Sequence, residues 1–129
     1  MKKVQTFSNS YLQFKANYEI YNACPVSATM KVIGGKWKPV ILYLIGHDVN
    51  RFSDMMREIK GISKKMLTDQ LRELERDGMI NRKVYAEVPP KVEYSLTAAG
   101  KSIKPVTNLM CKWGLENILA KQTPHPASR

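Results

Sequence analysis

Basic and hydroxyl side chains gather between residues 63 and 76, where they alternate with leucines. Leu67, Leu71 and Leu74 recur at steps of four and three, which predicts a helix with one buried stripe. At 100° per residue, the opposite face of this helix is polar and carries Lys65, Thr68, Asp69, Arg72 and Arg76. Such a face has the hydrogen-bond donors and positive charges that bind an anionic polymer.

The start of this segment is suited to phosphate. Ser63, Lys64 and Lys65 combine a capping hydroxyl, two positive charges and the unpaired N–H groups of a helix start. Arg72, and Thr68 with it, carry donors that can read base edges in the major groove of a duplex. We therefore assign the helix start to positioning on the backbone and the later residues to readout.

Asp69 is the exception on this face, because its carboxylate would repel phosphate. It either accepts a hydrogen bond from a cytosine amino group or pairs with Lys65 one turn earlier, and the spacing favours the pair. An isolated helix of this composition is more often a solvated surface. The neighbouring elements therefore decide between the two interpretations.

Those elements predict a helix-turn-helix. Phe52, Met55 and Ile59 are spaced to point inward from a short helix, and Gly61-Ile62 makes a tight turn before Ser63. Two helices joined by so short a turn are typical of a DNA-binding helix-turn-helix, whose second helix enters the major groove.

The stretch from Asn81 to Thr97 reads as a β-hairpin closed across Pro89 and Pro90. Val92, Tyr94 and Leu96 alternate with polar residues, so one face is expected to pack and the other to be wet. Lys91 stands just past the prolines and Arg82 near the base, where the hairpin can touch the DNA backbone or the minor groove. The sequence thus predicts a winged helix-turn-helix, mainly α with a small β-hairpin, that binds double-stranded DNA.

Two further segments carry more apolar surface than one small domain can cover. The first is an aromatic stripe on one helical face in residues 7–21, formed by Phe7, Tyr11, Phe14, Tyr18 and Tyr21, which packs either on its own domain or across a dimer. The second is a helix expected over residues 98–120, bent by Pro105, whose apolar positions are Ile103, Val106, Met110 and Trp113. We expect these residues to form the interface of a homodimer, which would read an imperfectly palindromic operator.

Composition favours the same partner. The chain has 129 residues, enough for one domain, and a net charge of +10, which favours nucleic acid over an acidic membrane surface. No apolar run approaches the roughly 20 residues of a membrane-spanning helix, and none follows Met1-Lys2-Lys3 as in a signal peptide. We expect a cytoplasmic protein with no membrane partner. In that compartment Cys24 and Cys111 are free thiols by default.

Three stretches of the sequence carry a family resemblance: CPVSATMKVIGGKW, RFSDMMREIKGISKKMLTDQLRELERDGMI and VYAEVPPKVEYSLTAAGKS. They resemble the HxlR family of bacterial and archaeal transcriptional regulators from about Cys24 to Ala120. The resemblance implies a homodimeric winged-helix regulator, more often a repressor, whose terminal helices form the dimer. It divides the chain into a helical arm (1–23), the family domain with its dimer helix (24–120, helix 98–120) and a disordered tail (121–129).

Several members of this family sense oxidants or electrophiles through an N-terminal cysteine, and Cys24 matches that position. A thiol at a helix N-terminus is favoured as thiolate by the helix dipole, which makes it reactive. The alternative is that Cys24 is a small apolar filler, since free cysteine is among the most buried residue types. Cys111 on the dimer helix is expected to be filler.

Other function classes are less well supported by the residues. No phosphate-cradling glycine loop, paired histidines or Cys-x-x-Cys is present, so we expect neither an enzyme nor a metal or other cofactor. A winged helix that binds only protein is a rival, although such domains tend to lack the basic residues found here. Control by a small ligand at the dimer interface is a further alternative to a cysteine sensor.

Overall fold

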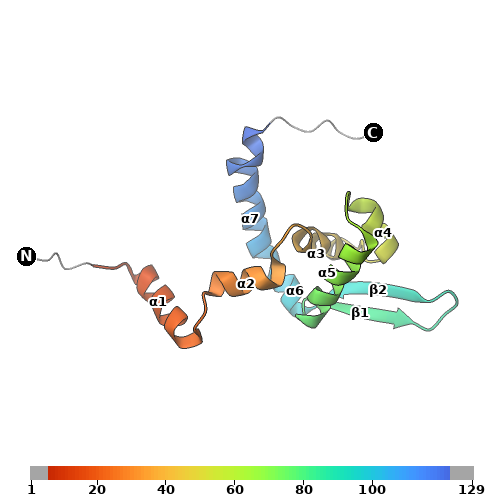
Figure 1. Cartoon of the computed structure of the whole chain (residues 1–129), viewed down its shortest axis with the longest axis horizontal. Helices are drawn as coiled ribbons and strands as arrows, with labels where there is room; N and C mark the ends of the chain where they lie inside the picture. Colours follow the sequence, from red (N-terminus) through yellow and green to blue (C-terminus); the bar gives the residue numbers. More distant parts are fainter. Residues whose placement is uncertain (1–5, 123–129) are drawn as a thin grey trace, which may run out of the picture.

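The computed structural model describes residues 6–122 of the chain. Figure 1 shows α1 and α2 extending to one side of a small body, the hairpin projecting on the other side, and α7 rising from the body. In chain order the elements are α1 (Asn9–Tyr21), α2 (Pro25–Ile33), α3 (Lys38–Gly46), α4 (Phe52–Glu58), α5 (Lys64–Arg76), β1 (Ile80–Tyr85), β2 (Lys91–Leu96), α6 (Ala98–Ser102), α7 (Lys104–Asn117) and the 3-10 turn η1 (Leu119–Lys121).

Helix α3 is the centre of the core, because its run of apolar residues meets α5 on one side and β2 on the other. Ile41, Leu42 and Ile45 are at most 5% exposed. The leucine stripe of α5 completes this core: Leu67, Leu71 and Leu74 are all buried, as their spacing predicts. Helices α4 and α5 with the turn between them form the predicted helix-turn-helix.

The hairpin has the predicted extent, with residues 86–90 joining the two strands. The strands are antiparallel, and Arg82 lies opposite Tyr94 while Tyr85 lies opposite Lys91. Tyr94 reaches the core, and its backbone N–H donates to the carbonyl of Asn50 over 2.9 Å. This bond ties the free edge of β2 to the loop after α3, which supports a hairpin that would be marginal alone.

The base of the hairpin is closed by a close backbone approach. The Thr97 hydroxyl donates to the Gly78 carbonyl over 2.6 Å and accepts from the Gly100 N–H over 3.0 Å, so Thr97 caps α6. A Cβ on Gly100 would lie 2.1 Å from the Met79 carbonyl oxygen. Only glycine therefore fits where α6 crosses the strand that enters the wing.

The single helix predicted over residues 98–120 is wrong. The structure has α6, then α7, with Ile103 acting as the C-cap of the first and the N-cap of the second, and η1 after Asn117. The physical reason is Pro105: it has no N–H to donate back along the helix, and its ring opposes a continuous helix, so α7 starts afresh with proline in its first turn.

Helix α1 lies within the aromatic segment of residues 7–21. Ser8 is its N-cap, and the Ser8 hydroxyl accepts from the Tyr11 N–H over 3.2 Å. No residue of α1 is buried, and in Figure 1 this helix lies apart from the body. At the other end, Lys121 belongs to η1 although it falls in the predicted tail, and residues 123–129 of that tail lie outside the described residues.

Candidate nucleic-acid interface

The N-terminus of α5 is an exposed, capped helix start. Ser63 has extended backbone angles, and its hydroxyl accepts from the Met66 N–H over 3.0 Å. Lys64 and Lys65 follow with exposed side chains. The remaining N–H groups of this turn and the two ammonium groups therefore face solvent together, an arrangement that favours an anion.

The middle of α5 carries the residues expected to meet bases. The Lys65 Nζ lies 2.7 Å from Asp69 Oδ2, so Asp69 pairs within the helix, as its spacing favours. The Thr68 hydroxyl donates to the Lys64 carbonyl over 2.8 Å and keeps only its acceptor capacity for a ligand. Arg72, one turn further along, is exposed. Arg76 is also exposed, and its Nε lies 3.6 Å from Asp77.

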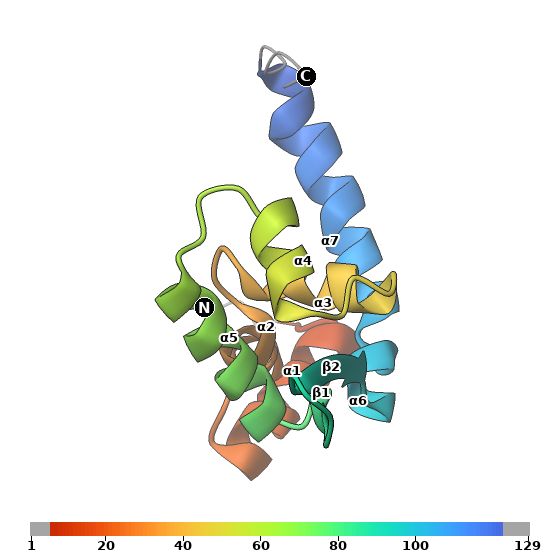
Figure 2. The ribbon, with the colours of Figure 1, turned by 90° about the vertical axis from the view of Figure 1, so that its right-hand side faces the viewer.

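A groove of about 320 Å³ separates α5 from the wing. Arg72 and Arg82 line it from opposite sides, one from the helix and the other from β1. Figure 2, which looks at the molecule from the wing, shows α5 beside the hairpin while α7 leads away from both. The remaining lining residues are Phe52, Thr68, Leu71, Glu75 and Tyr94. The structure thus places Arg72 and Arg82, ten residues apart in sequence, on the walls of one groove.

Lys91 is placed differently from Arg82. Its Nζ lies 2.8 Å from Glu93 Oε1 and 5.0 Å from the centre of the Tyr85 ring, on the hairpin face opposite to Tyr94. The Lys83 Nζ lies 4.7 Å from the same ring. The hydrogen bond from Lys91 lowers the pKa of Glu93 below its usual value, against a smaller opposing effect of desolvation. Lys91 is therefore partly neutralised by Glu93, which strand alternation places two residues away on the same face.

An ion pair that the sequence pattern does not predict links α3 to α5. The Lys38 Nζ lies 3.0 Å from Glu73 Oε2, and Lys38 is only 8% exposed. The pair joins the first turn of α3 to the third turn of α5, across the core. A lysine inside an otherwise apolar segment, Trp37 to Ile45, was the signal that could have found it.

Cys24 is the N-cap of α2 and is partly buried. The nearby N–H and hydroxyl of Ser27 lower the pKa of the Cys24 thiol, outweighing its desolvation, and the Val26 N–H adds to this effect. The thiol accepts no capping hydrogen bond of good geometry, so these groups act mainly as dipoles. Cys111 lies on α7 and is exposed. Between residues 6 and 122 both cysteines are free thiols.

Most residues predicted for a dimer interface are exposed in the described part of the chain, residues 6–122. Phe7, Tyr11, Phe14 and Tyr18 are each 42–48% exposed, and on α7 Trp113 is 60% exposed. Val106 and Met110 are exposed as well. Ile103 differs from the rest, because it packs against the core at the junction of α6 and α7.

Comparison with known proteins identifies the family. The family model for the HxlR-like helix-turn-helix matches residues 32–122, well over half of the chain. The HTH-type transcriptional regulator YtcD of Bacillus subtilis, itself uncharacterized, is 53% identical over 93 residues, 72% of this chain and 74% of that protein. An HTH-type regulator of Methanothermobacter thermautotrophicus is 50% identical over 91 residues, 70% of each chain.

Solved structures agree in fold. The redox regulator HypR in its oxidized form superposes with a TM-score of 0.67 at 49% identity, covering 73% of this chain and 97% of that one. The reduced form of the transcriptional regulator YodB from Bacillus subtilis gives 0.66 at 30% identity, covering 78% and 99%. Over residues 6–122 no helix combines the length and hydropathy needed to cross a membrane. The chain belongs to the HxlR family of transcriptional regulators and carries its winged helix-turn-helix domain.

Proposed function

We propose that this protein is a homodimeric repressor that binds a specific operator in double-stranded DNA through α5 and the wing. The observation that carries the proposal is the groove in which Arg72 of α5 faces Arg82 of β1. A helix that fits the major groove and a strand beside it supply donors to one stretch of duplex. Ser63, Lys64 and Lys65 hold the adjacent phosphates, and Thr68, Asp69 and Arg76 lie along the same helix.

Within the wing, Arg82 is the better placed contact. It lies on the hairpin face that looks toward α5, whereas Lys91 is engaged with Glu93 and Tyr85 on the other face. For Lys91 to contact phosphate, it must first give up the Glu93 carboxylate. We therefore assign the main wing contact to Arg82 and a weaker, backbone contact to Lys91.

The dimer is supported by the uncovered apolar side chains of α1 and α7. Aromatic residues on a helix with no buried residue are stabilised when a second copy of the chain covers them. A two-fold dimer places its two α5 helices about 34 Å apart on one side of a duplex. That geometry requires an imperfectly palindromic operator.

Regulation is proposed to act through Cys24. The lowered pKa of its thiol favours the reactive thiolate. Two proteins that share the fold also point to thiol chemistry: HypR is named a redox regulator, and a structure of YodB has been solved after treatment with diamide. Oxidants or electrophiles that modify Cys24 would move α2 against α3 and change the spacing of the two α5 helices.

One experiment tests operator, symmetry and sensing together. Genomic fragments bound by the protein are selected, and the operator is footprinted with wild type and Cys24→Ser, each with and without diamide. We expect two protected half-sites, and loss of binding on diamide treatment in wild type alone. Affinity that does not fall with rising salt would contradict DNA binding, because phosphate contacts release counterions. Equal loss in both proteins would remove the role of Cys24.

A further inference from the structure

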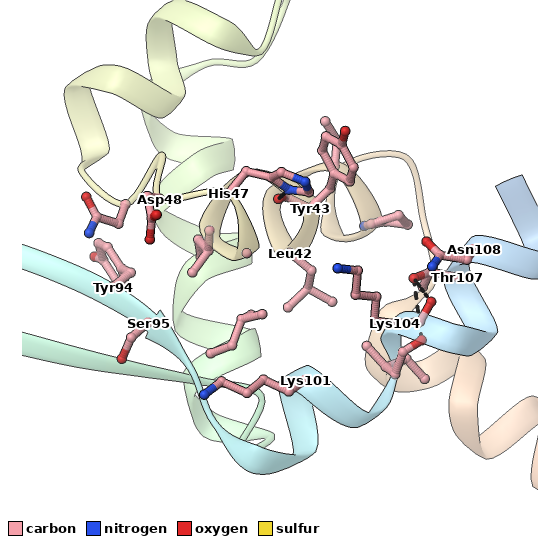
Figure 3. Close-up of a pocket in the computed structure, with 18 of the residues that line it drawn as sticks. Leu42, Tyr43, His47, Asp48, Tyr94, Ser95, Lys101, Lys104, Thr107 and Asn108 are labelled. Atoms are coloured by element: carbon pink, nitrogen blue, oxygen red, sulfur yellow. Dashed lines mark hydrogen bonds between the residues drawn. The ribbon is translucent and has the colours of Figure 1, made fainter.

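A cavity of about 620 Å³ lies on the far side of α3 from α5, between α3, the end of β2, α6 and the start of α7 (Figure 3). Its apolar wall is formed by Leu42, Ile45, Leu96 and Ile103. The volume falls within the roughly 300–1,000 Å³ of small-molecule sites. None of the residues that line it belongs to α5, so it is separate from the nucleic-acid interface.

Two lysines line this cavity, one directed into it and one along its rim. Lys104, the first residue of α7, directs its ammonium group toward Leu42 in the middle of the cavity, and Lys101 of α6 lies along the rim toward Ser95 (Figure 3). Neither lysine forms an ion pair within residues 6–122. Two ammonium groups without a carboxylate partner, beside an apolar wall, favour an anion that brings its own apolar part.

The opposite end of the cavity sets a limit on that anion. Asp48 lies there, just after α3, on the far side from Lys104 in Figure 3. His47 lies between, with its Nδ1 2.9 Å from the Tyr43 carbonyl and its ring 4.3 Å from the Tyr43 ring. No arginine lines the cavity to hold a phosphate in a bidentate fork. The charges thus suit a single negative group at the α7 end.

We propose that this cavity binds a small organic acid with one carboxylate and an aromatic or branched aliphatic body. The carboxylate pairs with Lys104, Lys101 adds positive charge from the rim, and the body lies on Leu42, Ile45 and Leu96. The Tyr43 and His47 rings form the edge nearest to solvent. A phosphate ester or dicarboxylate is disfavoured, because its second charge would approach Asp48 in a site of low polarity.

The position of the cavity connects such a ligand to regulation, a consequence that rests on the proposed function. Two of its walls, α3 and β2, belong to the half of the molecule that carries the DNA interface. A third wall, α7, carries the apolar residues proposed for the dimer. A bound acid would fix the angle between them, and hence the spacing of the two α5 helices.

The test uses the full-length protein without DNA and benzoate as the probe, with binding measured by isothermal titration calorimetry. We expect benzoate to bind and the neutral analogue benzamide to bind at least about tenfold more weakly, because the charge-assisted hydrogen bonds are lost. Lys101→Gln/Lys104→Gln should lose a similar factor for benzoate. Lys112→Gln, on the same helix but outside the lining, is the matched control and should bind as wild type does.

A second variant tests the location without removing charge. Thr107→Phe places a ring in the cavity from α7 and should abolish benzoate binding while circular dichroism and the dimer remain as in wild type. Equal binding of benzoate and benzamide, or unchanged binding by the double lysine variant, would overturn the proposal. The proposal would also be overturned if wild type does not bind benzoate and the Thr107→Phe dimer dissociates. That result would mean that a second copy of the chain covers the cavity. Operator binding is measured separately, so its failure does not affect these results.

Discussion

The Lys38 ammonium lies 3.0 Å from the Glu73 carboxylate, and this pair connects the central helix of the core to the helix proposed to enter the DNA. The two partners are not equally buried: the side chain of Lys38 is 9% exposed and that of Glu73 is 38% exposed. If Lys38 is removed, water can therefore hydrate the Glu73 carboxylate. If Glu73 is removed, water cannot reach the Lys38 ammonium in the same way.

This asymmetry predicts different effects of removing either partner. Glu73→Ala leaves a buried ammonium unpaired and should lower the free energy of unfolding by about 2–3 kcal/mol. Lys38→Met keeps the apolar stem and lets Glu73 hydrate, so it should cost less than about 1 kcal/mol. Urea unfolding of the three proteins measures both values. Equal losses of unfolding free energy in the two variants would contradict this prediction and would mean that the charges of the pair do not matter.

Arg72 is predicted to read sequence. Arg72→Ala should weaken operator binding by about 1–3 kcal/mol and relax the preference at one base pair of each half-site. The control is Arg57→Ala on α4, whose guanidinium pairs with Asp54 and does not line the groove. Fluorescence anisotropy with the operator and single-base variants measures both. A loss of affinity that is the same for every sequence would assign Arg72 to phosphate instead.

The wing contains a carboxylate whose titration reports on Lys91. The hydrogen bond from Lys91 lowers the pKa of Glu93, so its contribution to stability is full above the unfolded pKa. That contribution is lost as the pH falls through the lowered, folded pKa. Lys91→Met should move the Glu93 pKa back toward its ordinary value, as followed by carboxyl carbon NMR.

Ser27 is predicted to set the reactivity of Cys24, because its N–H and hydroxyl lower the thiol pKa. Ser27→Ala removes the hydroxyl but keeps the N–H, so the pKa should rise part of the way toward that of an ordinary thiol. Alkylation by iodoacetamide at neutral pH should then slow, since the thiolate is the reacting form. The rate is measured in a Cys111→Ser background. An unchanged rate would mean that the backbone alone is responsible.

Much of the fold followed from local patterns. The leucine spacing of α5, the cap at Ser63 and the alternation in β2 were all predicted, because each depends on residues close in sequence. The helix break at Ile103 was not, although Pro105 was expected to bend the helix there. One bent helix and two separate helices differ in whether Ile103 serves as a cap. That depends on how Ile103 packs against the core, which local sequence does not show.

The candidate site was predictable in part for the same reason. Helical periodicity placed Lys65, Thr68 and Arg72 on one face, and the Lys65–Asp69 pair follows from a spacing of four. Pairs between distant elements were missed: Lys38 with Glu73, and Arg72 with Arg82 across the groove. Their partners lie 35 and 10 residues apart, and only the packing of helices and strands brings them together.

The junction at Ile103 has a mechanical consequence. Because Pro105 has no N–H, no helical hydrogen bond runs from residue 105 back to residue 101, and the ladder is interrupted where α6 meets α7. Bending stiffness is therefore lowest at one residue, next to the core. The direction of α7 is set by what its exposed side chains touch, so a small change of contact at Trp113 becomes a large swing of the helix end.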